Sequence, residues 1–325
     1  MINSIKAFGC WLVVMASLFS TNVSEDKNTS EKIPWNIDRV DCMSINETVK
    51  TNEKDIRIGI IDTGIDMKHE DLIGNIHGGV NIFNSALSAD DDNGHGTMIA
   101  GIIAARQNGK GVVGIAPYAQ LFNIKAFSKD GKGKVTNVIK AIDWSINNKI
   151  QIINISSSFE KDNQELHNEI KKAAKAGILI VAAATDNSDN AGYPARYPEV
   201  ISVGSVNEQN KIMYSLGKHN NEIDIYSPGT DIYSTALNNT YQKSEGNSMA
   251  AAHITGILAV ILSNPKKIDA NFDKVVDHKE ALERLIKTGF TYEQDGEPYI
   301  IANCYNAINM PLISPETQIL TKNYP

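Results

Sequence analysis

Five short apolar runs alternate along the chain with segments of helical periodicity. The runs are largely continuous rather than alternating with polar residues, which is typical of strands buried on both faces of a parallel sheet. Between them, residues 135–149 and 164–177 place apolar residues at helical spacing, and the second segment ends at Gly177, a common helix terminator. The pattern predicts an α/β fold with three layers around a mostly parallel, doubly wound sheet. The predicted strands are residues 56–62, 121–127, 150–156, 178–184 and 200–206.

Length and charge limit the class of protein. A chain of 325 residues, of which 42% are hydrophobic, is long enough for one large α/β domain with a filled core. Lysine and arginine number 31 against 38 aspartates and glutamates, which gives a net charge of -7, and no basic block occurs. This balance argues against nucleic acid as the main partner, and we expect a monomer. Because no repeat or second domain is evident, residues 33–312 are predicted to form one domain, followed by a tail at 313–325.

The N-terminus has the composition of a targeting segment. Lys6 precedes an apolar run at residues 7–19, and the chain then becomes polar and rich in turn formers. The run is shorter than the roughly 20 residues that span a bilayer. We predict a signal sequence at 1–24, a short polar segment at 25–32, and a protein that is secreted or held on the outer face of the cell membrane. An uncleaved membrane tether and a buried helix are the alternatives.

The three cysteines give no metal-binding pattern. Cys10, Cys42 and Cys304 form neither a C-x-x-C pair nor a metal spacing, and Cys10 lies in the predicted signal sequence. The sequence allows a disulfide between Cys42 and Cys304, but nothing in it supports this pairing.

Three polar residues stand at the ends of predicted strands and helices. Asp62 ends the first strand, His95 opens an apolar helix, and Ser248 opens another, each among glycines and small residues. Ligands of doubly wound sheets bind beyond the carboxyl ends of the strands. A serine becomes nucleophilic when an imidazole takes its proton, and a carboxylate fixes the tautomer of that imidazole. Singly, the three could be a turn residue, a surface histidine and a helix cap; together they predict a catalytic triad.

In these motifs, "GIIDTGID", "NGHGTMIAG" and "GNSMAAAHITG", the chain resembles the subtilisin family of serine proteases, whose triad follows the order Asp, His, Ser. The similarity extends through "GVVGIAPYAQL", "YPARYPEVISVGSV" and "YSPGTDIYSTA". It implies a sheet of the subtilisin type, with residues 33–312 as the catalytic domain and no catalytic cofactor. It also implies that Asp62 orients, that His95 is general base and acid, and that Ser248 forms an acyl-enzyme in a serine endopeptidase.

The resemblance also implies how a peptide or protein substrate binds. In the family an extended peptide adds itself as a strand beside two enzyme segments. The matching segments are residues 128–135 and 154–160. The second departs from the family, which has glycines where Ser158 and Phe159 stand, and Phe159 is expected to narrow or roof the pocket for the residue before the cut. The candidate substrate-binding residues are Gly131, Lys132, Gly133, Ser156, Ser157, Ser158 and Phe159.

The oxyanion position carries an acid. An ungapped alignment puts Asp186 where the family has an asparagine that donates to the oxyanion, and Thr185 where it has a glycine. An ionised carboxylate would repel the developing charge, so only a protonated Asp186 can donate. One neuroendocrine proprotein convertase of this superfamily also has an aspartate here. Alternatively Asn187 supplies the amide, with the backbone N–H of Ser248 as a donor in either case. A third alternative is a catalytically impaired relative that only binds peptides.

A structural calcium site is implied as well. Asp71 and Asn108 match family positions that bind this ion, and Glu31 is a candidate third oxygen donor. Calcium takes six to eight oxygens, and loop carbonyls could supply the others. The alternative is that Asp71 caps a helix and Asn108 occupies a turn.

Two features narrow the biological expectation. Only about a dozen polar residues separate the apolar run at residues 7–19 from "KIPWNIDRV", too few for the folding pro-domain of secreted family members, and no wall anchor or accessory domain is evident after residue 310. Both features, and the "PWNIDRV" segment, resemble the processing proteases of lantibiotic gene clusters, which remove a leader from one precursor peptide. We therefore predict a dedicated leader peptidase for a lantibiotic precursor, with a general extracellular protease as the alternative.

Overall fold

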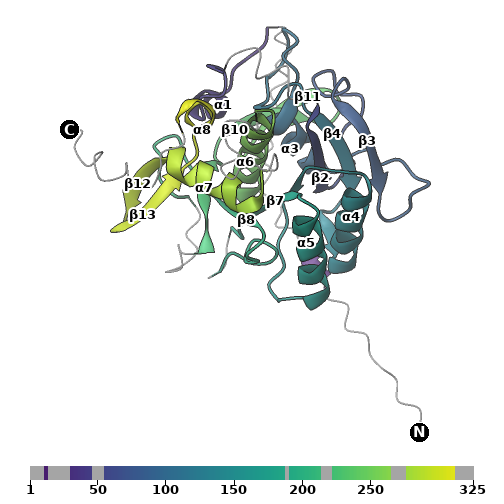
Figure 1. The fold of residues 1–325 in the computed structure, drawn as a ribbon. Helices are drawn as coiled ribbons and strands as arrows, with labels where there is room; N and C mark the ends of the chain where they lie inside the picture. Colours follow the sequence, from purple (N-terminus) through teal and green to yellow (C-terminus); the bar gives the residue numbers. More distant parts are fainter. Residues whose placement is uncertain are drawn as a thin grey trace, which may run out of the picture.

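A nine-stranded sheet forms the centre of the protein in the computed structural model, which describes residues 11–13, 30–45, 55–186, 190–213, 222–264 and 276–311 (Figure 1). The strand order is β12-β13-β9-β8-β7-β6-β2-β4-β3, and every neighbouring pair is parallel except the hairpin β12–β13. The strands are β2 (Arg57–Asp62), β3 (Ile76–Asn81), β4 (Gln120–Lys125), β6 (Ile152–Ile155), β7 (Leu179–Ala183), β8 (Ile201–Val206), β9 (Ile225–Pro228), β12 (Phe290–Gln294) and β13 (Glu297–Ile301). This confirms the predicted α/β fold.

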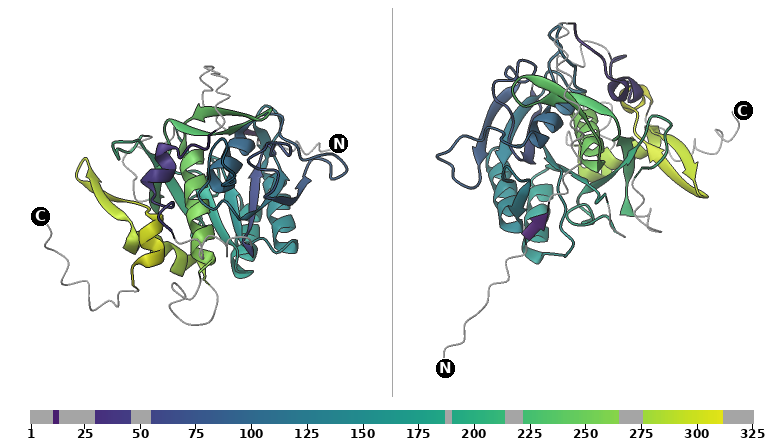
Figure 2. Two further views of the ribbon diagram at one scale, coloured as in Figure 1. Left: turned by 90° about the horizontal axis from the view of Figure 1, so that it is seen from above. Right: turned by 180° about the vertical axis from the view of Figure 1, so that it is seen from behind.

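Helices cover both faces of this sheet (Figures 1 and 2). Successive side chains of a strand point to opposite faces: on β2, Ile58 and Ile60 join the apolar cluster of α3 and α6, whereas Ile61 joins that of α4 and α5. The sheet is therefore the middle of three layers, as predicted. The helices are α1 (Trp35–Arg39), α3 (His95–Ala104), α4 (Val135–Asn147), α5 (Gln164–Lys175), α6 (Asn247–Leu262), α7 (His278–Thr288) and α8 (Cys304–Asn309).

The strand order also fixes where a site can form. β2 lies between β4 on one side and β6 on the other, and after β3 and β4 on the first side the chain crosses to β6 and continues outward through β7, β8 and β9. Such a switch point leaves a crevice at the carboxyl ends of the adjacent strands. The last residue of β2 is Asp62, which therefore lies at this crevice.

Two short antiparallel pairs lie outside the large sheet. β10 (Ile232–Ala236) pairs with β11 (Thr240–Ser244), and β1 (Trp11–Val13) pairs with β5 (Lys132–Lys134). The remainder of the predicted signal sequence and the tail at 313–325 lie outside the described residues. Among the helices that are described, none combines the length and apolar character needed to cross a membrane.

A disulfide joins the two ends of the domain. Cys42, shortly after α1, is bonded to Cys304, the first residue of α8, with a Cα–Cα distance of 5.2 Å. The backbone N–H of Cys304 also donates to the carbonyl of Val40. The bond spans 262 positions of the chain, and both cysteines are buried. The pairing that the sequence left open is therefore formed.

Candidate active site

Asp62 and His95 form a buried pair at the crevice. Asp62 ends β2 and His95 begins α3, with 2% and 7% of their surfaces exposed. His95 Nδ1 lies 2.8 Å from one carboxylate oxygen of Asp62 and 2.9 Å from the other. A carboxylate at Nδ1 holds the ring so that Nε2 is left to exchange protons. The structure thus brings together two of the three predicted triad residues, separated by 33 positions in sequence.

The charge of Asp62 raises the basicity of His95. Burial alone would lower the pKa of the imidazole, but the charge and hydrogen bond of Asp62 outweigh it, and Asp91 and Asp186 add smaller contributions in the same direction. The pKa of His95 is therefore raised above its ordinary value.

Asp91, which the sequence analysis did not identify, holds this pair in position. Its Oδ1 accepts hydrogen bonds from the Thr63 hydroxyl and from the backbone N–H groups of Asn93 and Gly94, at 2.9 to 3.0 Å. Its Oδ2 accepts from the N–H and the hydroxyl of Thr97, at 3.0 and 2.7 Å. Thr63 follows Asp62 directly, and the other donors flank His95, so one carboxylate joins the end of β2 to the start of α3.

Lys125 is a second residue that the sequence analysis missed. It ends β4, lies opposite Asp62 in the parallel register, and is 6% exposed. Its ammonium group donates to the carbonyl of Thr63 and, at 2.6 Å, to the carboxylate of Asp92. A buried ammonium is tolerated when such partners compensate for lost water. The signal available in the sequence was a lysine at the end of an apolar strand.

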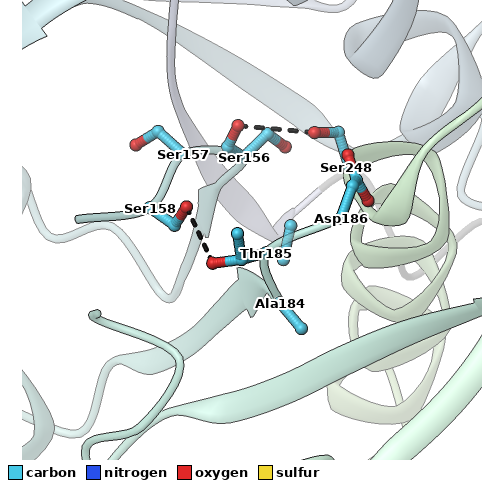
Figure 3. Close-up of a pocket in the computed structure, with 8 residues that line it drawn as sticks. Ser156, Ser157, Ser158, Ala184, Thr185, Asp186 and Ser248 are labelled. Carbon is cyan, nitrogen blue, oxygen red and sulfur yellow. Dashed lines mark hydrogen bonds between the residues drawn. The ribbon is translucent and has the colours of Figure 1, made fainter. Parts of the chain in front are cut away.

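Ser248 is the second residue of α6, which packs against α3. Gly246 precedes the helix with a φ of 140°, a conformation that residues with a Cβ rarely adopt. The Ser248 hydroxyl donates to the carbonyl of Ser156 across 3.4 Å (Figure 3). The positive end of the helix dipole is directed at this position, which favours a negative charge there.

Asp186 approaches the same helix end from the loop after β7. Its Oδ1 accepts the N–H of Asn247 at 2.9 Å, and it lines one pocket together with Ser248 (Figure 3). Burial raises the pKa of this carboxyl, whereas the hydrogen bond from Asn247 and the charge of His95 oppose the rise. Asn187, the alternative donor, lies outside the described residues.

The pocket beside Ser248 is formed by the segment after β6 and the end of β7. Thr185 and Ser158 approach each other across it, with their hydroxyl oxygens 3.1 Å apart (Figure 3). Phe159 does not line the pocket: its side chain is 5% exposed, joins the apolar cluster of α4 and α5, and its backbone pairs with Tyr193. The lining residues are Ser156, Ser157, Ser158, Ala183, Ala184, Thr185, Asp186 and Ser248.

The other predicted substrate segment forms β5. Gly131 and Gly133 are buried, and Lys132 between them is exposed. A Cβ at Gly133 would lie 2.4 Å from the ring of Phe127, so only glycine fits there. The loop that leads into β5 contacts the catalytic segment, because the carbonyl of Lys129 accepts the side-chain amide of Asn93 at 2.8 Å. The pairing of β1 with β5 indicates that this backbone edge accepts an antiparallel strand.

The three predicted calcium ligands lie close together, and their side-chain oxygens accept hydrogen bonds from neighbouring groups. Glu31 accepts the backbone N–H groups of Asn108 and Gly109, at 2.8 and 3.0 Å. The carboxylate of Asp71 accepts the side-chain amide of Asn108, the N–H of Val112 and the hydroxyl of Tyr241. A carboxylate oxygen that accepts one hydrogen bond keeps a second lone pair, so these contacts do not prevent ligation of an ion, and the calcium site stays a prediction. No cluster of three or more acidic, histidine or cysteine side chains suited to a metal occurs in the part of the chain that the structure describes.

Comparison with known proteins gives one family. The model of the subtilase family matches residues 53–296. The chain is 37% identical over 242 residues to minor extracellular protease Epr of Bacillus subtilis, which is 74% of this chain and 37% of that protein. It is 39% identical over 249 residues to an intracellular serine protease of Paenibacillus polymyxa, covering 73% and 75% of the two chains. Subtilisin E of Bacillus subtilis is 33% identical over 270 residues, which are 81% of this chain and 69% of subtilisin E.

Proposed function

The chain belongs to the subtilase family of serine endopeptidases, and from this premise we propose that it hydrolyses peptide bonds through an acyl-enzyme on Ser248. The observation that carries the proposal is the buried contact between His95 Nδ1 and Asp62, at 2.8 Å, at the carboxyl end of β2. It is supported by the position of Ser248 at the start of α6, the helix that packs against the helix of His95.

Each triad residue then has a defined role. His95 Nε2 removes the proton from Ser248, whose oxygen attacks the carbonyl carbon of the substrate. The carboxylate of Asp62 stabilises the imidazolium that forms, and His95 returns the proton to the leaving amine. Water, activated by the same imidazole, releases the acyl group. The hydroxyl of Ser248 donates to the carbonyl of Ser156 at 3.4 Å, so it must turn away from that carbonyl before it can give its proton to the imidazole.

A fluorophosphonate probe tests this proposal, because it reacts covalently with an activated serine. We expect labelling of the wild-type protein and none of Ser248→Ala or His95→Ala, measured by intact-protein mass spectrometry. Equal labelling of all three proteins, or no labelling of a folded wild-type protein, would contradict the proposal.

A catalytically impaired, peptide-binding relative is the second candidate, and one observation favours it. Asp186 accepts the N–H of Asn247 at the start of α6, an arrangement that stabilises the ionised carboxylate. That charge would repel the oxyanion that forms beside Ser248. The proposal of an active enzyme therefore includes a neutral Asp186, or an amide from Asn187, that donates to the oxyanion.

We further propose that the substrate is one leader-bearing lantibiotic precursor. The "PWNIDRV" segment supports this, and so does the small size of the pocket beside Ser248. The enzyme should cut a precursor encoded near its gene at one bond and leave casein largely intact. Extensive digestion of casein would favour a general protease.

Secretion is proposed with this function. The Cys42–Cys304 disulfide supports it, since such bonds persist in oxidising compartments. One relative is described as extracellular and another as intracellular, so the proposal rests on the disulfide and on the apolar run at residues 7–19.

A further inference from the structure

We propose that the pocket beside Ser248 accepts only small side chains, those of glycine, alanine and serine, at the substrate residue before the cut, because a Ser158–Thr185 contact closes it. The inference rests on the proposed endopeptidase function and specifies its substrate. The Oγ atoms of Ser158 and Thr185 lie 3.1 Å apart, one from the segment after β6 and the other from the loop after β7 (Figure 3). We call this pair the hydroxyl bridge.

The hydroxyl bridge is completed by a third group. The hydroxyl of Thr185 also lies 3.1 Å from the carbonyl of Ala191. A hydroxyl has one hydrogen, so both contacts are satisfied when Thr185 donates to Ala191 and Ser158 donates to Thr185. Breaking the bridge would leave polar atoms of the pocket wall without these partners.

The walls that carry the hydroxyl bridge are fixed by backbone contacts. The N–H of Thr185 donates to the carbonyl of Ala191 at 3.0 Å. Phe159, next to Ser158, pairs with Tyr193 through two backbone hydrogen bonds of 2.7 and 2.8 Å. The backbone of Gly192 lies close behind the bridge. A Cβ at this position would lie 2.4 Å from the Thr185 hydroxyl, so even a methyl group does not fit between them. Neither wall can therefore move aside without breaking further contacts.

The space that remains is small. The centre of a water molecule can occupy only about 20 Å³ inside the pocket. One water molecule needs about 10 to 15 Å³ by the same measure, so the pocket holds one or two. The one or two side-chain heavy atoms of alanine or serine fit this space, and the seven of phenylalanine do not.

The walls also set the polarity of the ligand. Ser156, Ser158 and Thr185 surround the pocket with oxygen atoms, and the buried hydroxyl of Ser157 has no partner among the described residues. A serine side chain in the substrate could exchange hydrogen bonds with these groups. Asp186 is the one charged group of the lining, but it lies beside Ser248 and not beyond the hydroxyl bridge (Figure 3), so a lysine or arginine is excluded by its length.

The test is a series of peptides that differ only in the residue before the cut, which is glycine, alanine, serine, leucine, phenylalanine or arginine. We expect kcat/KM for alanine or serine to exceed that for phenylalanine and for arginine by about 100-fold or more. The variant Ser158→Gly/Thr185→Gly should raise kcat/KM for phenylalanine at least about tenfold. Thr185→Val removes the hydroxyl but keeps the bulk of the side chain, and the backbone contacts still fix both walls, so the pocket stays filled and this control should retain the wild-type ranking.

Several outcomes would overturn the inference: a wild-type preference for leucine, phenylalanine or arginine, or an unchanged ranking in the double glycine variant with an unchanged melting temperature. A second measurement separates this failure from failure of the proposed function. In Ser248→Ala, which cannot cut, the alanine peptide should bind with a Kd at least about tenfold lower than the phenylalanine peptide by isothermal titration. Equal affinities would reject the small pocket, whereas absence of cleavage and of fluorophosphonate labelling would reject the protease.

Discussion

Asp186 places a carboxyl group at the point where hydrolysis would develop a negative oxygen. The oxygen needs a donor there, and only the protonated carboxyl has a hydrogen to give. Burial raises the pKa of Asp186, while the N–H of Asn247 and a charged His95 lower it. When His95 is neutral, as a general base must be, the last of these effects disappears and the pKa of Asp186 is higher.

The rate should therefore depend on pH in both directions. As pH falls through the raised pKa of His95, the imidazole is protonated and the base is lost. As pH rises through the pKa of Asp186, which burial raises, the donor becomes a repelling charge; this limb lies above that of His95 when the negative substrate oxygen holds Asp186 protonated. We expect a bell-shaped profile of kcat, and Asp186→Asn should remove its alkaline limb. The same variant should raise kcat by a large part of the roughly 10²- to 10³-fold that one oxyanion donor supplies, as measured by steady-state kinetics.

Two further variants identify the donor. Asp186→Ala should lower kcat if the neutral acid donates. If Asn187 donates instead, Asn187→Ala should cause the loss and Asp186→Asn should change little. If Asp186→Ala and Asn187→Ala both keep nearly the wild-type rate and the pH profile is unchanged, neither side chain donates to the oxyanion.

At the scale of elements, β2 and α3 are joined by one partly buried carboxylate, that of Asp91. Asp91 accepts five hydrogen bonds from the residues that flank Asp62 and His95. Its charge also contributes to the raised pKa of His95. The orientation of the Asp62–His95 pair therefore depends on a residue whose described hydrogen bonds do not include one to the imidazole.

Asp91→Asn should affect both stability and the pH profile. The asparagine amide has one accepting oxygen and one donating nitrogen, so the N–H and O–H groups that face the nitrogen lose their acceptor. The free energy of unfolding should therefore fall by about 2–4 kcal/mol in urea denaturation. Loss of the charge lowers the pKa of His95, so the acid limb of kcat/KM should move to lower pH. The exposed neighbour Asp90 is a matched control, since Asp90→Asn makes the same change of charge. Equal shifts in both variants would indicate a general charge effect.

At the scale of the whole molecule, the Cys42–Cys304 disulfide ties α8 to the residues that follow α1 across 262 positions. A crosslink over so long a loop restricts the unfolded chain, and Cys42→Ser should lower the free energy of unfolding by about 2–4 kcal/mol. Urea denaturation with and without reductant measures this difference. Reductant should destabilise the wild type and leave Cys42→Ser unchanged; destabilisation of both would assign the effect to another group.

Much of the fold could be predicted from local patterns in the sequence. Residues 56–62 and 178–184 were predicted as strands and form β2 and β7 to within two residues, and residues 135–149 include α4. Fully buried strands and amphipathic helices have periodicities that are properties of the segment itself. β3 and β12 were not predicted, because both are partly exposed edge strands with too few apolar residues to form a continuous run.

The sequence by itself determined the α/β class, the residue types of the triad and the acid at position 186, since each is fixed by a short motif. Only the tertiary structure decided that Phe159 belongs to the core, that Ser158 meets Thr185, and that donors occupy the oxygens of Asp71. Each of these facts depends on a contact between residues far apart in the chain. Such contacts are decided by how the layers pack against each other, which no local pattern encodes.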